Sequence, residues 1–202
     1  MKAQFRFPLF VFSFLSFSLA FAALPPQFSE CMGNDGGTKL SIYDLRDISK
    51  VSTLTVCQNQ LSLLNKYDTA DLIKNGKVRA GISLSKSTYL KEDLLDIAKS
   101  GTYVLYVDNA KLDKTALMDL LRAGVQVVVM TASSGLAKPD LIEMARVKPF
   151  ILNVDSIMLK EDLRDIVNAG TQVVIRSNQA NLTKDDIIFV ARANADLVTV
   201  MP

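Results

Sequence analysis

Histidine and tryptophan are absent from this 202-residue sequence, and cysteine occurs only twice. Without histidine, the chain can form no His-based catalytic triad and has no histidine general base or metal ligand. The sequence therefore predicts no metal site and no bound cofactor, and it favours a non-enzymatic role over an enzymatic one.

An excess of either charge is also missing from most of the chain. The formal net charge of +2 equals the charge of Lys2 and Arg6, and residues 1–22 contain no acidic residue. Residues 23–202 therefore contain 21 basic and 21 acidic residues. This balance leaves no basic field for nucleic acid or for an anionic membrane surface, so we expect no nucleic-acid partner.

One long apolar run occurs, at the N-terminus. Lys2 and Arg6 precede an uncharged run from Phe7 to Ala22, which ends in a small-residue site. This arrangement predicts a secretory signal peptide over 1–22. The run is shorter than the ~20 residues that a membrane span needs, so we expect no stable membrane insertion after cleavage. The predicted location is the periplasm, with the extracellular space as the alternative.

Cys31 and Cys57 both lie beyond the predicted cleavage site. In an oxidising compartment an isolated cysteine pair is expected to form a disulfide. Residues 23–39 have turn-forming composition without periodicity, which predicts a flexible leader that Cys31 ties to the remaining chain.

Residues 90–202 repeat one pattern five times: a leading leucine, a short charged helix, a glycine or its substitute, and a β-branched strand. The helices are predicted to stop at Gly101, Gly124, Lys148, Gly170 and Asn194, at intervals of 23, 24, 22 and 24 residues. The three glycines and Asn194 are expected to take the left-handed conformation that ends a helix. Pro149 is expected to end its helix after Lys148 instead.

The segment Val51-x-x-Leu54-x-Val56-x-x-Asn59-x-Leu61 resembles the conserved stretch of leucine-rich repeats. Shorter versions recur around Tyr106 and Ile175, but valine replaces leucine in most strands and every unit carries a full helix. The resemblance implies a shared architecture over residues 40–202.

Period and resemblance together predict an α/β fold, a right-handed solenoid of about seven repeats over 40–202. Its single parallel sheet carries helices on one face. Strands lie ~4.8 Å apart, whereas packed helices need ~8–10 Å, so the sheet must curve with its helices outward. A closed or partial (β/α) barrel is the alternative, although a closed barrel needs eight strands and the pattern contains seven.

The concave face is predicted to bind a macromolecular partner. Small or polar neighbours place Leu54, Val56, Ile82 and Leu84 on the helix side. Carrying that register through the repeat predicts a contiguous apolar block, which Val198 and Val200 continue, on the open face. An exposed patch of this kind on a soluble protein marks an interaction surface. The predicted binding residues are Tyr103, Leu105, Val107, Val128, Met130, Phe150, Leu152, Val154 and Val174.

The sequence thus favours an exported, non-enzymatic repeat protein with a protein partner or with self-association. The first alternative is a small barrel-like enzyme that uses Asp108, Asp155 and Arg176, which follow or end three strands, where the active sites of barrels form. The second alternative is a carrier of an apolar ligand bound on the same face.

Overall fold

The computed structural model describes residues 23–32, 40–57, 64–74 and 76–202. The predicted signal peptide over 1–22, part of the predicted leader and Asn59 and Leu61 of the repeat motif lie outside the described residues. The elements are α1 (Pro26–Cys31), α2 (Ile42–Val51), β1 (Leu54–Val56), α4 (Lys66–Lys74), β2 (Val78–Ser83), α5 (Lys91–Ala98), β3 (Tyr103–Val107), α6 (Lys114–Arg122), β4 (Gln126–Met130), α7 (Lys138–Val147), β5 (Ile151–Val154), α8 (Lys160–Asn168), β6 (Gln172–Arg176), α9 (Lys184–Ala191), the 3-10 turn η1 (Ala195–Leu197) and β7 (Val198–Met201).

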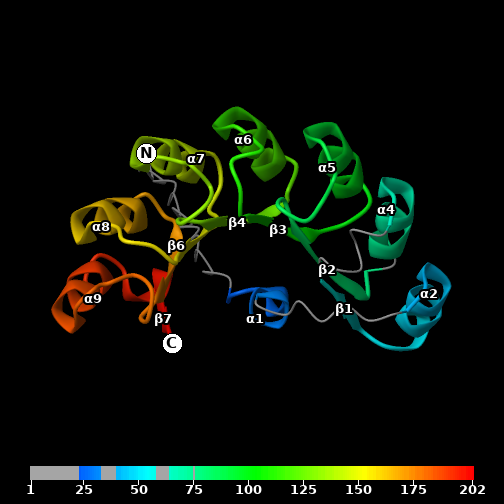
Figure 1. The fold of residues 1–202 in the computed structure, drawn as a ribbon, viewed down its shortest axis with the longest axis horizontal. Coiled ribbons are helices and arrows are strands. Elements are labelled where there is room, and N and C mark those ends of the chain that lie inside the picture. Colours follow the sequence, from blue (N-terminus) through cyan, green and yellow to red (C-terminus); the bar gives the residue numbers. More distant parts are fainter. Residues whose placement is uncertain (1–22, 33–39, 58–63, 75) are drawn as a thin grey trace, which may run out of the picture.

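The seven strands form one parallel sheet in their order along the chain, from β1 to β7. Each strand follows a helix, so the described chain contains seven helix–strand units, which confirms the predicted α/β repeat fold. Helix α2 and the helices from α4 to α9 lie along the convex side of the curved sheet, and α1 lies on its concave side (Figure 1). Among the described strands, β1 pairs only with β2 and β7 only with β6, so the sheet is an open arc.

Two apolar layers lie on opposite faces of this sheet. The larger layer is packed between the strands and the convex helices, and includes Leu94, Leu117 and Leu163, all fully buried. We call the smaller layer, on the concave face, the inner cluster. It consists of Phe28, Val104, Tyr106, Val128, Ile151 and Val174.

Two of the three glycines predicted to end helices have the predicted left-handed conformation. Gly124 and Gly170 have φ of +94°, where L side chains are strained. The backbone of Val125 donates to the Leu120 carbonyl at 3.1 Å, which completes a Schellman-type stop after α6.

The same prediction is wrong for Gly101 and Asn194. Gly101 is not among the positive-φ residues, and Asn194 is extended with φ of −163°. Gly101 is instead a close-approach position: a Cβ there would lie 2.6 Å from Cγ2 of Ile73, at the end of the neighbouring helix α4. Lys148 is also extended, as expected for a residue that precedes proline.

Among the described residues, no helix is both long enough and apolar enough to cross a membrane.

Candidate functional site: the concave face of the sheet

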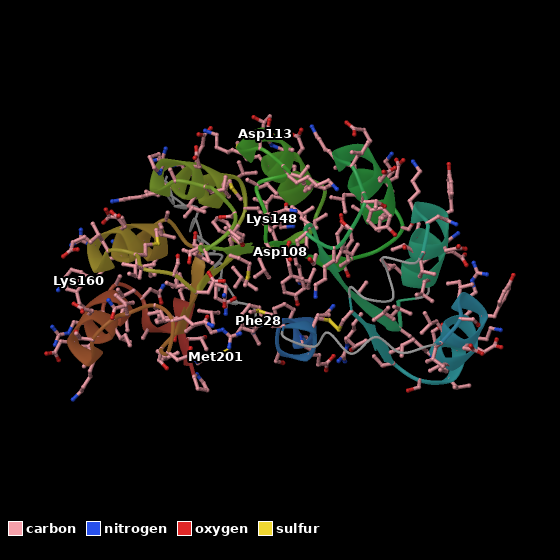
Figure 2. The ribbon with its side chains drawn as sticks, in the orientation of Figure 1. Phe28, Asp108, Asp113, Lys148, Lys160 and Met201 are labelled. Atoms are coloured by element: carbon pink, nitrogen blue, oxygen red, sulfur yellow. A yellow bond between two sulfur atoms is a disulfide. The ribbon has the colours of Figure 1, made fainter. Side chains whose placement is uncertain are left out.

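Helix α1 covers the centre of the concave face. Phe28 on this short helix is fully buried in the inner cluster, where it packs with side chains of β3, β4, β5 and β6. The hydroxyl of Tyr106 donates to the Gln27 carbonyl at 2.7 Å. Burial, followed by the nearby Glu30 carboxylate, raises the pKa of the Tyr106 hydroxyl. Figure 2 shows Phe28 inside the arc, between the helix and the sheet.

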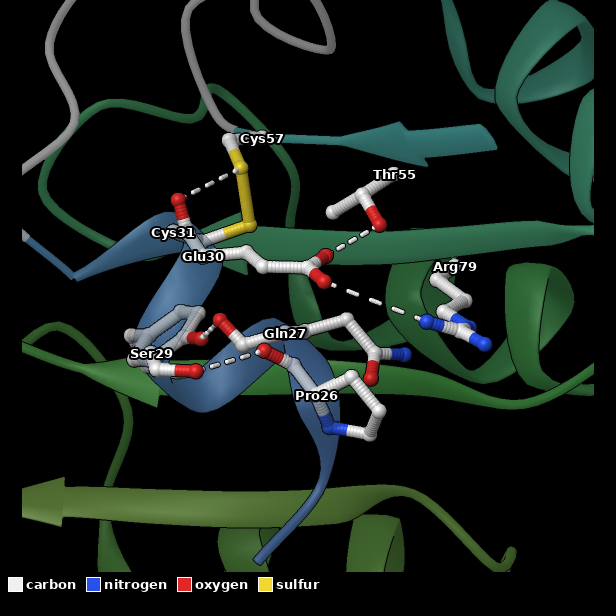
Figure 3. The surroundings of a disulfide bond; sticks show 9 residues. Pro26, Gln27, Ser29, Glu30, Cys31, Thr55, Cys57 and Arg79 are labelled. Carbon is white, nitrogen blue, oxygen red and sulfur yellow. Dashed lines mark hydrogen bonds and ion pairs between the residues drawn. A yellow bond between two sulfur atoms is a disulfide. The ribbon is translucent and has the colours of Figure 1, made fainter. Parts of the chain in front are cut away.

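A disulfide fixes α1 to the first strand. Cys31, the last residue of α1, is bonded to Cys57 just after β1, which confirms the predicted pair (Figure 3). Glu30 accepts a hydrogen bond from Thr55 on β1, and its carboxylate lies 3.9 Å from the Arg79 guanidinium on β2. These polar contacts surround the disulfide and orient the end of the helix.

The sheet makes room for the disulfide at Gly81. A Cβ at this position would lie 2.8 Å from Sγ of Cys31, closer than real Cβ contacts allow. The absence of a side chain therefore lets the Cys31 sulfur lie directly against β2.

Six of the nine predicted binding residues face the helices, so the predicted orientation is wrong for them. The cause is strand register, because paired residues of a parallel ladder lie on the same face of the sheet. Leu105 pairs with Ile82, and Leu152 pairs with Val129, both on the helix side. Val200 likewise pairs with Ile175 and lies on the helix side with Val198. The six residues in the convex core are Tyr103, Leu105, Val107, Phe150, Leu152 and Val154.

The other three predicted residues do lie on the concave face. Val128 and Val174 are fully buried members of the inner cluster, beneath Phe28. Met130, at the end of β4, is partly exposed and packs against the edge of the cluster. That any of the three binds a partner stays a prediction.

The carboxylates of the enzymatic alternative are occupied by the loops around them. Asp108 accepts hydrogen bonds from the hydroxyls of Ser83 and Ser85 and, at 2.8 Å, from the Ser85 backbone. Asp155 accepts from the Thr131 hydroxyl at 3.0 Å and from the Ala132 backbone at 2.8 Å. Each carboxylate thus joins the end of its own strand to the loop after the preceding strand.

Nor do these groups converge on one point. Asp108 follows β3, Asp155 follows β5 and Arg176 ends β6, so the sequential strand order separates the first from the last by three strand spacings. At ~4.8 Å for each spacing, that distance is roughly 14 Å along the sheet. The described residues also contain no group of three acidic or cysteine side chains arranged to hold a metal ion.

Arg176 belongs to the concave face. Its Nε donates to the Asn153 side-chain oxygen at 3.2 Å, and its guanidinium carbon lies 5.8 Å from the centre of the Phe28 ring. Its Nη2 lies 3.6 Å from the sulfur of Met32, the residue after α1. Arg176 thus links the last strands to the segment that covers the sheet.

Asn153 is a concave-face residue that the sequence pattern did not identify. It pairs with Met130 and Val174, it is fully buried, and its amide nitrogen has no hydrogen-bond partner among the described residues. A buried N–H group without a partner costs about 1–3 kcal/mol. An asparagine between Leu152 and Val154 in a buried strand is the available sequence signal, and the register error placed it on the other face.

Two hollows in the described chain bear on the apolar-ligand alternative. The larger, about 370 Å³ between α2 and α4, is lined partly by the charged residues Arg46, Lys50 and Asp71. The smaller, about 150 Å³ beside Thr131 and Ser156, is below the ~300–1,000 Å³ of typical ligand pockets. Neither hollow is the apolar pocket that this alternative requires.

Comparison with known proteins does not place the chain in a family. No family model matches it, and no curated protein matches it. The solved structures to which it is similar include one described as the structure of oxaloacetate acetylhydrolase in complex with the product oxalate. The identity to that chain is 11% and the TM-score is 0.38, over 79% of this chain and 72% of the other. A likeness at this level carries no conclusion about activity.

Proposed function

We propose that the protein is an exported, non-enzymatic scaffold that binds a segment of a protein partner on the concave face, beside α1. The binding region is the part of this face around Arg176 that α1 leaves accessible, and the buried Asn153 lies against it as the acceptor of the Arg176 Nε hydrogen bond. The observation that carries the proposal is the buried Asn153 amide without a partner among the described residues, next to the partly exposed Arg176 guanidinium. Both groups are donors, so they match a backbone carbonyl or a carboxylate of a segment that displaces the side chains over Asn153 as it binds.

The apolar rim of this region supports the proposal. Met32, Met130 and Met201 are all partly exposed and pack against the inner cluster. Methionine side chains are flexible and polarizable, and they are over-used at surfaces that adapt to protein segments. The region therefore offers two fixed donors surrounded by deformable apolar contacts.

The polar groups at the strand ends favour binding over catalysis. Asp108 and Asp155 each have loop hydroxyl and backbone donors, and a carboxylate held in this way serves the structure of its loop. The proposed compartment is the periplasm or the cell exterior, because a cysteine pair that ties α1 to β1 is stable where thiols are oxidised.

The test is capture from a cell-envelope extract with the purified, oxidised chain, followed by measurement of the Kd for the captured partner. We expect Asn153→Leu to weaken binding roughly tenfold or more, because a buried hydrogen bond to the partner is lost. The same substitution removes an amide without a partner among the described residues but also the acceptor of the Arg176 hydrogen bond, so the free energy of unfolding should change by no more than about 1 kcal/mol.

Ile157→Ser is the matched control, since Ile157 follows β5 and is 76% exposed. It should bind with wild-type affinity. The proposal is overturned if the wild-type chain captures no protein, if Asn153→Leu binds with unchanged affinity, or if Ile157→Ser loses as much affinity as Asn153→Leu.

A further inference from the structure

The convex helices are joined by a regular ladder of ion pairs. Five helices begin with a lysine whose ammonium group binds acidic side chains on the next helix, in its third or sixth position. These pairs are Lys66 with Asp93 and Asp96, Lys91 with Asp119, Lys114 with Asp140 and Glu143, Lys138 with Asp162 and Asp165, and Lys160 with Asp186. Figure 2 labels Lys160 on the outer side of α8. The ladder therefore has a direction, from the lysine of one unit to the acids of the next.

In the third position, the two carboxylate oxygens have separate tasks. Asp93 uses Oδ2 to accept from the backbone of Leu90 at the start of its own helix, and Oδ1 to bind Lys66. Asp186 divides its oxygens in the same way between Thr183 and Lys160. One oxygen caps the helix and the other receives the preceding lysine.

The sixth position follows a similar rule. Asp119 on α6 accepts a hydrogen bond from Arg122 of its own helix through Oδ1. Through Oδ2 it accepts from Lys91 of the preceding helix, at 2.6 Å. Asp96 on α5 does the same with Lys99 and Lys66.

Helix α2 carries this acidic pair, and no ladder lysine of the described residues binds it. Asp44 is its third residue and caps the helix through Oδ2 on Ser41, while Oδ1 makes no bond within the described residues. Asp47 is its sixth residue and binds Lys50 through Oδ1, while Oδ2 is unused in the same part of the chain. Both aspartates are exposed. The acceptor end of the ladder is thus complete and unfilled at α2.

Helix α9 carries the opposite feature. Its first residue, Lys184, is exposed and forms no ion pair with any described residue, whereas the five ladder lysines keep only 29–40% of their side-chain area exposed. Ile188 on α9 is 39% exposed, and Val200 on β7 is 49% exposed although its pairing partner Ile175 is fully buried. Between neighbouring units of the described chain, the corresponding positions are covered by the adjacent helix–strand unit.

The sheet has complementary free edges at the same two ends. Strand β7 next to α9 pairs only with β6, and β1 next to α2 pairs only with β2, among the strands that the structure describes (Figure 1). Edge strands present unpaired backbone groups that template the addition of another strand.

We propose that the α9–β7 end of one copy docks onto the α2–β1 end of a second copy, head to tail. Lys184 of one molecule then binds Asp44 and Asp47 of the next, β1 extends the parallel sheet beyond β7, and Val200 and Ile188 are covered by the incoming unit. The occupant is a second copy because this chain carries both halves of one ladder step. Lys184 on α9 has no ion-pair partner among the described residues, and Asp44 and Asp47 on α2 are the acceptors that such a lysine binds elsewhere in the ladder. The interface is heterologous, so it produces a ring if the rotation closes and a filament if it does not. Its ion pairs lie on the convex helices, away from Asn153 and Arg176, and the inference does not rest on the proposed function, although Met201 on β7 adjoins both regions.

The test is sedimentation velocity of the purified full chain over a wide concentration range. The wild-type chain should form concentration-dependent oligomers that weaken at high salt, because exposed ion pairs are screened. Lys184→Glu should raise the dissociation constant roughly tenfold or more, because attraction becomes repulsion at both aspartates. The double variant Asp44→Asn, Asp47→Asn should have a similar effect, and it keeps a side-chain oxygen to cap α2.

Two further samples make the result specific. Lys148→Glu changes the charge of an exposed lysine away from both ends, and it should assemble like the wild-type chain. A mixture of Lys184→Glu with Asp47→Lys should recover assembly that each variant lacks alone, since the introduced carboxylate of the first variant then faces the introduced ammonium group of the second. A monomeric wild-type chain at all concentrations, or oligomers that Lys184→Glu leaves unchanged, would overturn the proposal. Asn153→Leu should assemble normally, so failure of the concave site and failure of this interface are distinguishable.

Discussion

The close approach of the disulfide to β2 makes Gly81→Ala a sensitive test of how α1 is seated. A Cβ at Gly81 would lie 2.8 Å from Sγ and 3.2 Å from Cβ of Cys31, and 3.1 Å from a ring carbon of Tyr106. The disulfide cannot move freely, because Cys57 holds it beside β1. Over-packing of this kind costs about 1–3 kcal/mol, so we expect the free energy of unfolding to fall by that amount.

Removal of the sulfur should reduce this effect. In the background Cys31→Ala, Cys57→Ala the 2.8 Å contact with sulfur disappears, whereas the contacts with Tyr106 at 3.1 Å and with Cβ of residue 31 at 3.2 Å remain. The preference for alanine over glycine, about 0.5–1 kcal/mol, offsets part of their cost. Gly81→Ala should therefore cost clearly less in this background, which gives a coupling energy on the order of 1 kcal/mol or more.

Urea unfolding of the four chains, followed by circular dichroism, measures the coupling directly. An additive result, with the same cost for Gly81→Ala in both backgrounds, would refute the position of Cys31 over β2.

Two further predictions concern the glycines and the ion-pair ladder. Gly124→Ala should lower the free energy of unfolding by about 1 kcal/mol or more through its positive φ alone. Gly101→Ala should lower it through contact with Ile73, and the added variant Ile73→Ala should partly rescue this loss. Equal rescue by Ile73→Ala at both glycines would contradict this distinction. Hydrogen bonds from Lys160, and then from Thr183, lower the pKa of Asp186 to about 2, below the ~3.9 of an unfolded aspartate. The stabilisation from this group is therefore present above about pH 4 and lost as the pH falls toward 2. The difference in urea midpoint between the wild-type chain and Lys160→Met should shrink over that interval, and a constant difference from pH 7 to pH 2 would show that the pair does not contribute.

The fold was largely predictable because its signals are local. A leucine stripe, an acidic first turn and a β-branched strand recur in most units, α6 lacking the acidic first turn, and they predict the seven helix–strand units that the sheet contains. The position of the helices on the convex side was predictable because packed helices are spaced more widely than neighbouring strands. The cysteine pair was predictable from its isolation in the sequence, and the structure confirms the bond.

Strand faces were not predictable from the repeat, because the loops vary in length by single residues. The predicted spacing from Gly101 to Gly124 is 23 residues, but Val104 pairs with Gln126, 22 positions further on. Gly101 ends its helix through close packing and not through a left-handed turn, so the two glycines are not equivalent positions. A slip of one residue turns every side chain to the opposite face. The slips recur from strand to strand, and the predicted faces are therefore right for β4 and β6 and wrong for β3, β5 and β7.

The position of α1 depends on contacts that no local pattern encodes. The hydrogen bond from Tyr106 to the Gln27 carbonyl joins residues 79 positions apart, and the composition around Phe28 indicates only an irregular leader. Once Phe28 is seated, most of the concave apolar residues become a second core and cease to be a surface. The inner cluster thus explains why a concave face rich in valine is stable in water. The partly exposed edge of this cluster is the region in which the proposed partner would bind. Next to this cluster a buried asparagine keeps an amide without a partner among the described residues, beside an arginine. This arrangement costs stability, and the proposed function predicts that an acceptor from a bound segment would recover that cost.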